Sequence, residues 1–384
     1  MACEEILLPE KTRLRFSSGE TIGRTESAFV IRFSNKRNVL STSWLNGGFR
    51  ENLTAVFNHQ MPLAACDACH ANGGVKTYLE DVAASLSLDP AATSGLITRA
   101  EMRNAAIVSA THLDLYVTAV VTAGIDKNGG RAGDPSSYHE TDGRFEPVGG
   151  TINTILIIGA DLPEYAMTRA VMTATEAKAA ALQQLMARSI YSSGIATGSG
   201  TDMIAIVTNP GSPHHLSDTG KHSKLGELIG ITVIRATIAA LEKETGLSPA
   251  SQRDVLVRLS RFGITEEDLW KDAVQRGYVK NTRPEERERF MQYLKSWARE
   301  PGAVAQAAAA LHVLDEVGWG LLPQAVTQDT IIRILVDGEK DIPAAGDRPL
   351  DCVIAMLARQ AARGFPAPRN LHRSLLGTES AGPK

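Results

Sequence analysis

Near its start the chain alternates apolar and polar positions, a period that is typical of half-buried strands. Between residues 12 and 45 this alternation predicts a β meander. Two of its strands are expected to be joined by a turn at 34–37, because Ser34-Asn35-Lys36-Arg37 separates two apolar runs. The glycines of Asn46-Gly47-Gly48 should then end the strand pattern, since glycine permits positive φ or a close backbone approach.

Further along, continuous aliphatic runs predict buried strands, because strands covered on both faces lose the alternation. These runs lie at 112–121, 154–158 and 203–207. Helical spacing of apolar residues after Pro163 and after Lys221 predicts two long helices, the first capped by Asp161 and the second ended by Gly246. We therefore expect an α+β fold, in which a mixed or mainly antiparallel sheet is packed by helices.

The pattern changes at Ser248-Pro249, beyond which the apolar spacing is helical and strand signals are few. This change predicts two domains, a catalytic one over 1–247 and an all-helical one over 248–384. The second domain carries no motif that indicates its role. It could form a dimerisation element, a lid or a partner-docking domain, so a homo-oligomer is one expected assembly.

Composition narrows the classes of protein. The chain has 384 residues, 43% of them hydrophobic, and a formal net charge of −3, which argues against a general nucleic-acid binder. No stretch reaches the roughly 18 apolar residues of a membrane span, and the first ten residues lack an export signal. We therefore expect a cytoplasmic protein. Four cysteines in so long a chain do not make a disulfide scaffold.

Two neighbouring segments concentrate groups that can bind ligands. Thr197-Gly198-Ser199-Gly200-Thr201-Asp202 precedes an apolar run and could present backbone N–H groups to an anion, or simply form a tight strand entry. Lys221, His222 and Lys224 lie at the expected start of the following helix, where the dipole favours anions. Such an arrangement indicates a ligand or carboxylate nearby. The competing interpretation is that Lys224 and Glu227 are ordinary surface residues.

Cys66-Asp67-Ala68-Cys69-His70 matches the c-type haem attachment pattern, and its thiolates and imidazole are good zinc ligands. Nothing directs export for haem attachment, and no second cysteine pair completes a zinc site. An ordinary loop is therefore the default interpretation, with a metal site at Cys66, Cys69 and His70 as the alternative. His59 follows an apolar run and could be a general base or a core histidine.

An ordered set of motifs resembles the adenosylcobinamide amidohydrolase family of corrinoid salvage, over roughly residues 25–245. The motifs are Asn46-Gly47-Gly48, Asn58-His59, Thr122-Ala123-Gly124, Arg131-Ala132-Gly133-Asp134-Pro135, Gly150-Thr151-Ile152-Asn153, Glu176-Ala177-Lys178, Thr197 to Asp202 and Gly220 to Gly230. The resemblance implies hydrolysis of the aminopropanol amide of adenosylcobinamide, which gives adenosylcobyric acid. It implies a corrinoid substrate, and we expect no cofactor beyond that substrate's own cobalt corrin ring. The competing hypothesis is a corrinoid carrier without catalysis.

Residue chemistry suggests two routes for the amide. Water could be activated by His59, Asp202 or His222 while Lys221 and backbone N–H groups stabilise the oxyanion; alternatively, Thr201 or Ser199 could attack after activation by His222. The absence of a nucleophile-elbow motif favours water. The predicted substrate-binding residues are Asn46, Gly47, Gly48, Arg131, Asp134, Thr151, Asn153, Thr197, Gly198, Ser199, Gly200, Thr201, Lys224 and Glu227.

Overall fold

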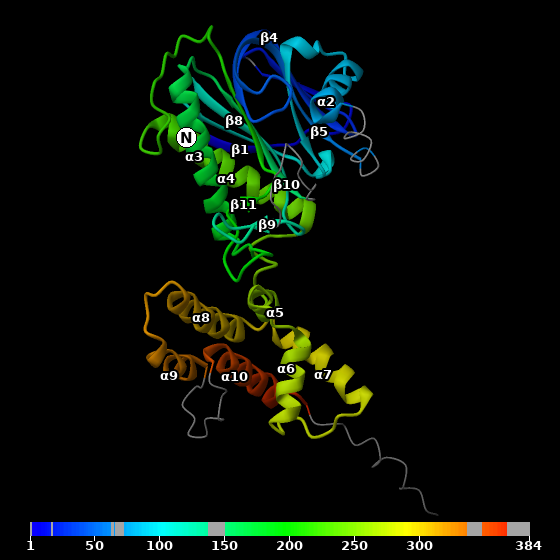
Figure 1. The fold of residues 1–384 in the computed structure, drawn as a ribbon, viewed down its shortest axis with the longest axis vertical. Coiled ribbons are helices and arrows are strands. Elements are labelled where there is room, and N and C mark those ends of the chain that lie inside the picture. The colour runs from blue at the N-terminus through cyan, green and yellow to red at the C-terminus, as the bar shows by residue number, and fades with distance from the viewer. Residues whose placement is uncertain are drawn as a thin grey trace, which may run out of the picture. The chain divides into compact units, whose positions relative to one another are not determined.

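The computed structural model describes residues 2–16, 18–62, 65, 73–136, 150–335 and 348–366. The chain forms two compact units, Met1–Gln252 and Arg253–Lys384. The first unit holds the strands and the second is helical (Figure 1). This arrangement confirms the predicted fold class.

A ten-stranded mixed sheet forms the frame of the first unit. Its strands are β1 (Ala2–Ile6), β2 (Arg13–Arg15), β3 (Glu20–Arg24), β4 (Ala28–Ser41), β5 (Gly48–Gln60), β6 (Thr93–Thr98), β7 (Ala106–His112), β8 (Leu115–Gly124), β10 (Thr151–Ile158) and β12 (Met203–Thr208). Their order is β1-β7-β8-β10-β12-β4-β3-β2, with β5 paired to β4 and β6 paired to β5. Most neighbours are antiparallel, whereas β10 pairs with β12, and β5 with β6, in parallel. Two short strands, β9 (Gly129–Gly130) and β11 (Gly198–Ser199), form a separate pair.

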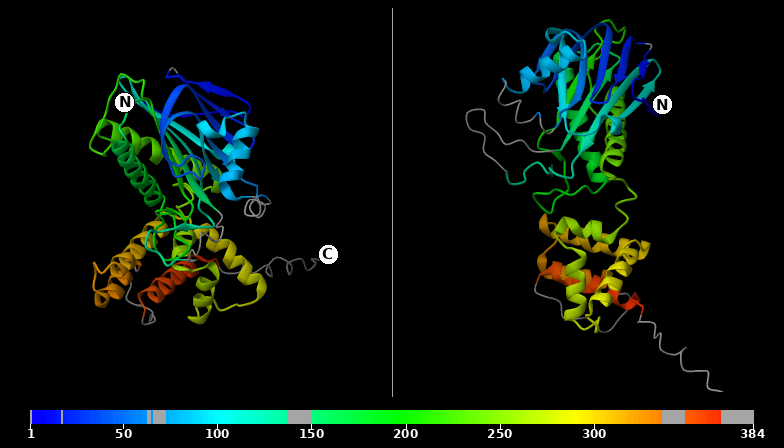
Figure 2. Two further views of the ribbon diagram at one scale, coloured as in Figure 1. Left: turned by 45° about the horizontal axis from the view of Figure 1, so that its top comes forward. Right: turned by 90° about the vertical axis from the view of Figure 1, so that its right-hand side faces the viewer.

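The helices α3 (Glu164–Gln184) and α4 (Lys224–Thr245) pack against each other and cover one face of this sheet (Figures 1 and 2). The core beneath them includes Leu156, Ile206, Leu228 and Val233, all fully buried. A parallel pair of strands needs a crossover connection, and α3 supplies it between β10 and β12. Helix α3 therefore begins after β10 and ends at Gln184, and the chain then runs through residues 185–197 to the glycine-rich turn that leads into β12.

A second core fills the other face of the sheet, where β5 and β6 fold over it. Val56, Leu96 and Ile155 lie in this core, although they come from β5, β6 and β10. The helix α2 (Gly74–Ser85) covers the outer side of β4 and β5. Strand β10 is buried along its whole length because both of its faces are covered.

The predicted turn at 34–37 is wrong. Strand β4 runs through this segment as one bulged strand, with register shifts against β5 between Arg32 and Arg37 and between Arg37 and Val39. The bulge places Arg37 inside the protein, where its guanidinium donates to Glu20 at 2.9 Å. A buried charge of this kind requires a partner. The polar residues around Arg37 favoured a turn, and the sequence pattern does not show that Glu20 pairs with Arg37.

The two long helices begin and end for different reasons. Helix α4 starts after Ser223, whose Oγ accepts from the backbone N–H of Gly226 at 3.0 Å, and it ends at Gly246 with φ of 72°, as predicted. The predicted cap of α3 is wrong, because Pro163 precedes its first residue and makes no side-chain cap bond. The Asp161 carboxylate instead lies 2.9 Å from His215 Nδ1, within hydrogen-bond distance.

The second unit is built from helices around its own apolar core. They are α5 (Val255–Leu259), α6 (Glu266–Gln275), α7 (Pro284–Trp297), α8 (Pro301–Gly318), α9 (Gln324–Leu335) and α10 (Pro349–Gly364). Phe290, Leu294 and Leu357 lie at the centre of the core, and Arg261 pairs with Asp315 inside it at 2.6 Å. Among the residues that the structure describes, no helix is both long and apolar enough to cross a membrane.

Candidate functional site

Asp202 organises the glycine-rich turn before β12. Its carboxylate accepts hydrogen bonds from the Ser199 hydroxyl at 2.6 Å, the Ser199 N–H at 3.0 Å and the Ile152 N–H at 2.9 Å, and it forms an ion pair with Lys178. A Cβ at position 198 would lie 2.4 Å from Asp202 Oδ2, so Gly198 makes room for the carboxylate. With four donors around it, this carboxylate is a poor candidate for taking a proton from water.

Two threonine hydroxyls lie at the same end of β10 and β12. The Thr151 hydroxyl lies 2.6 Å from the Thr201 carbonyl and 2.8 Å from the Thr201 hydroxyl, which itself donates to the Gly150 carbonyl at 2.6 Å. The amide of Asn128 also donates to the Gly150 carbonyl, at 2.7 Å. The network fixes the turn, and Asn128 is a member that sequence reasoning missed. A Cβ on Gly200, in contrast, would meet no atom within 4 Å.

Buried amides connect strands on the inner face of the sheet. Asn153 Nδ2 donates to Asn58 Oδ1 and to the Ile97 carbonyl, both at 2.8 Å, and Asn58 Nδ2 donates to the Thr122 hydroxyl at 2.8 Å. Asn153 Oδ1 is buried and has no hydrogen-bond partner among the described residues. Three of the motif segments therefore meet in one network. Asn153 is only 1% exposed, so this network is buried.

His59 is directed away from that network, because successive strand residues point to opposite faces. Its ring packs against Tyr78 of α2, with Nε2 2.9 Å from the Tyr78 hydroxyl. Burial lowers the pKa of His59, with a smaller opposing effect from the Ser27 backbone, so the neutral imidazole is favoured. The structure thus separates His59 from the other predicted catalytic residues.

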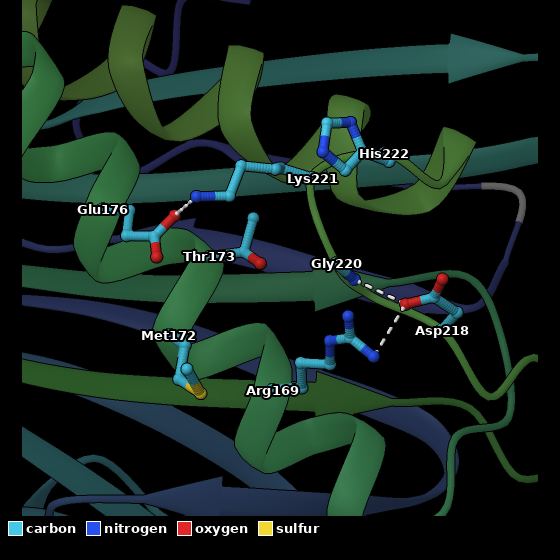
Figure 3. A pocket seen from close by; sticks show the side chains of 8 residues that line it. All are labelled: Arg169, Met172, Thr173, Glu176, Asp218, Gly220, Lys221 and His222. Atoms are coloured by element: carbon cyan, nitrogen blue, oxygen red, sulfur yellow. Dashed lines mark hydrogen bonds and ion pairs between the residues drawn. The ribbon is translucent and has the colours of Figure 1, made fainter.

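A pocket of about 160 Å³ lies between α3 and the segment that precedes α4 (Figure 3). It is lined by Arg169, Met172, Thr173, Glu176, Asp218, Gly220, Lys221 and His222. The segment at Gly220, which lines the pocket, packs closely against the first turn of α4. A Cβ on Gly226 would lie 2.0 Å from the Gly220 carbonyl oxygen. Only glycine at position 226 lets the first turn of α4 approach that segment so closely.

Charged groups surround this pocket in two pairs. Lys221 Nζ forms an ion pair with Glu176 of α3, while Arg169 lies 3.4 Å from Asp218. Asp218 also accepts from the Gly220 N–H at 2.9 Å. The exposed imidazole of His222 has no hydrogen bond or ion pair to any residue that the structure describes. The pocket is therefore lined both by this imidazole and by a lysine whose ammonium is oriented by Glu176.

The structure corrects the electrostatic argument for the helix start. Helix α4 begins at Lys224, so Lys221 and His222 precede its N-cap rather than occupy its first turn. Lys221 is paired with Glu176 and Lys224 with Glu227, so neither ammonium is left opposing the dipole without a carboxylate. The exposed Lys224–Glu227 pair matches the surface interpretation, whereas Lys221 lies in the pocket.

Helix α3 contacts both the glycine-rich turn before β12 and the segment after β12 that leads into α4. Lys178 contacts Asp202 at the glycine turn, and Glu176 contacts Lys221 at the pocket. Residues two apart on a helix point to different sides, so the two contacts lie on different flanks of α3. Glu176 and Lys178 are absent from the residues that we predicted to form the site. Their motif was visible, but their partners depend on tertiary packing.

The remaining predicted substrate-binding residues lie elsewhere in the first unit. Asn46 donates to the Pro90 and Thr93 carbonyls at 2.8 and 2.7 Å, and it turns the chain into β5 with φ of 52°. At Gly47 a Cβ would lie 2.0 Å from the Ser43 carbonyl oxygen, and Gly48 has φ of 72°. These three residues form a tight turn.

Arg131, Asp134 and Thr197 shape the loop beside β9 and β11. Asp134 accepts from the Arg131 N–H at 2.7 Å and from the Ser189 hydroxyl at 2.6 Å. Burial acts to raise the pKa of Asp134, but the hydrogen bonds from Ser189 and its neighbours outweigh burial and lower it. Thr197 accepts from the Ala132 N–H at 2.9 Å. Asp134 thus combines turn formation with a stable negative charge.

Cys66, Cys69 and His70, the alternative metal site, lie outside the described residues. Within the described ranges, no group of three or more histidine, cysteine, aspartate or glutamate side chains could hold a metal ion.

Comparison with known proteins shows similarity to a family, to a relative and to a solved structure. The family model described as adenosylcobinamide amidohydrolase matches residues 13–249. An uncharacterized protein of Methanocaldococcus jannaschii is 38% identical over 227 residues, which span 56% of this chain and 86% of that protein. The crystal structure of the PH0078 protein from Pyrococcus horikoshii is similar with a TM-score of 0.30 and 12% identity, over 62% of this chain and 83% of that one.

Proposed function

The chain belongs to the adenosylcobinamide amidohydrolase family, and from this premise we propose that it hydrolyses the aminopropanol amide of adenosylcobinamide. The products are adenosylcobyric acid, which re-enters coenzyme B12 synthesis, and aminopropanol. The observation that carries the proposal is one pocket lined both by His222, which has no partner among the described residues, and by the Lys221–Glu176 ion pair. Purified protein incubated with adenosylcobinamide should release both products; no release would remove the enzymatic proposal.

The residues of this pocket can supply the groups that amide hydrolysis needs. His222 takes a proton from water, and the water oxygen attacks the amide carbonyl carbon. Negative charge then develops on the carbonyl oxygen, where the Lys221 ammonium held by Glu176 stabilises it. The carbon–nitrogen bond breaks as His222 passes the proton to the leaving amine. One water is consumed, and the propionate and the amine leave.

Direct attack by water is favoured over a covalent route through Thr201 or Ser199. The Ser199 hydroxyl donates to Asp202, and the Thr201 hydroxyl donates to the Gly150 carbonyl. Neither hydroxyl has His222 as a partner, although the covalent route needs a base within hydrogen-bond reach of its nucleophile. Asp202, with its bonds to Ser199, Ile152 and Lys178, is better suited to holding the turn in place than to catalysis.

A corrinoid carrier that lacks catalysis is the second candidate function. Its support is that the lysine, arginine and carboxylates that line the pocket are held in ion pairs, an arrangement that can bind a ligand without reacting with it. Titrating adenosylcobinamide while following both its visible spectrum and free aminopropanol separates the two proposals. A spectral change without released amine supports the carrier, whereas release with turnover supports the enzyme.

We also propose that the first unit alone holds the activity. All pocket residues lie within Met1–Gln252, and the family match ends at residue 249. A chain truncated after Gln252 should therefore keep kcat for adenosylcobinamide within about twofold of the full chain. Steady-state kinetics checks this expectation, and circular dichroism shows whether the truncated chain is folded. A folded but inactive chain would assign the helical unit a part in catalysis.

A further inference from the structure

The outer face of α3 carries two large apolar side chains that are exposed in the part of the chain that the structure describes. Tyr165 is 66% exposed and Met172 is 60% exposed. They are seven residues apart, which is two helical turns or about 10 Å along the axis. Arg169 lies between them at helical spacing, so the three side chains form one stripe. Single exposed apolar residues are ordinary, but a stripe that meets a pocket indicates a ligand surface.

The stripe is continuous with the pocket. Arg169 and Met172 line the pocket as well as belonging to the exposed face of α3, and Figure 3 shows them on the same helix as Glu176. The pocket has a volume of about 160 Å³, below the roughly 300 Å³ at which sites for drug-sized ligands begin. A corrinoid is far larger than that. Its amide arm can enter the pocket, and its macrocycle must lie on the surface outside.

We propose that the stripe formed by Tyr165, Arg169 and Met172 is the surface on which the corrin ring rests while the scissile arm enters the pocket. This inference depends on the proposed function, because it takes the arm to be in the pocket. An aromatic ring and a thioether give broad apolar contact to the face and methyl groups of a macrocycle. The guanidinium of Arg169 carries five donors, and the carboxamides around a corrin ring accept hydrogen bonds.

The test compares the double variant Tyr165→Ala/Met172→Ala with the unaltered chain. Two readouts are needed: KM and kcat for adenosylcobinamide, and Kd for adenosylcobyric acid, which lacks the arm, from its visible spectrum. We expect KM and Kd to rise by about tenfold or more, as for the loss of a stacking contact, while kcat stays within about twofold. Leu113→Ala, at an exposed leucine on the β7–β8 hairpin, is the matched control and should change neither value.

The outcomes distinguish failure of this inference from failure of the proposed function. If the unaltered chain hydrolyses adenosylcobinamide but the double variant keeps its KM and Kd, the stripe is not the ring surface and the function stands. If the chain binds adenosylcobyric acid but does not hydrolyse adenosylcobinamide, and the double variant binds adenosylcobyric acid more weakly, the surface stands and the catalytic proposal fails. A double variant that changes the oligomeric state by light scattering, with unchanged Kd, makes the stripe a protein interface and overturns the inference.

Discussion

Replacing His222 with alanine is expected to lower kcat for adenosylcobinamide hydrolysis by about 10² to 10⁴-fold, the usual contribution of a positioned acid–base group. We assign His222 the transfer of a proton from water to the leaving amine, since the charged residues that line the pocket are held in ion pairs. Because its side chain is exposed, the substitution should leave the melting temperature unchanged. Single-turnover kinetics on the folded variant measures the effect.

His215→Ala provides the matched control for that measurement. His215 is also an exposed histidine in the segment between β12 and α4, but it contacts Asp161 and does not line the pocket. Its variant should retain full turnover. Turnover by His222→Ala at the level of the unaltered chain would remove His222 from the mechanism.

Replacing Lys221 with methionine is expected to lower kcat by about 10² to 10³-fold, the loss seen when a donor to a developing oxyanion is removed. Methionine keeps most of the length of the lysine side chain but not its charge, so the pocket keeps its shape. KM should change less than kcat, because the lysine acts on charge that appears only in the transition state. Lys221→Arg retains the charge and should recover part of the rate.

The control for Lys221 is Lys243→Met. Lys243 is also paired with a glutamate, Glu5, but it lies near the other end of α4 and outside the pocket. Loss of turnover in both variants would point to a general electrostatic effect, and an unchanged kcat in Lys221→Met would exclude the oxyanion role. Glu176→Gln adds a further measurement: it should lower kcat by less than Lys221→Met, since the ammonium stays but loses its orienting partner.

The elements that could be predicted from sequence are those whose cause is local. The aliphatic run 154–158 predicts a buried strand because covered strands lose polar alternation, and β10 confirms it. Gly246 ends α4 because the C-cap needs positive φ. The bulge at Arg37 could not be predicted, since a buried arginine depends on Glu20, a residue on a different strand.

The site shows the same division between local and tertiary causes. Lys221 and His222 stand out by residue type, and the structure places both in one pocket. Their partner Glu176 lies 45 residues earlier in the chain and could not be assigned to them without the packing of α3 on the α4 segment. Asn58 and His59 are adjacent in sequence yet face opposite sides of β5, so a shared motif did not mean a shared site.

The measurement that tests the account most directly is a time course of both products from adenosylcobinamide. Purified full-length chain is incubated with the substrate, and adenosylcobyric acid and aminopropanol are quantified by mass spectrometry. We expect equal amounts of the two products that grow over many turnovers, with the rate falling by about 10²-fold or more in His222→Ala. Bound but uncleaved substrate, or cleavage at the same rate in both proteins, would contradict it.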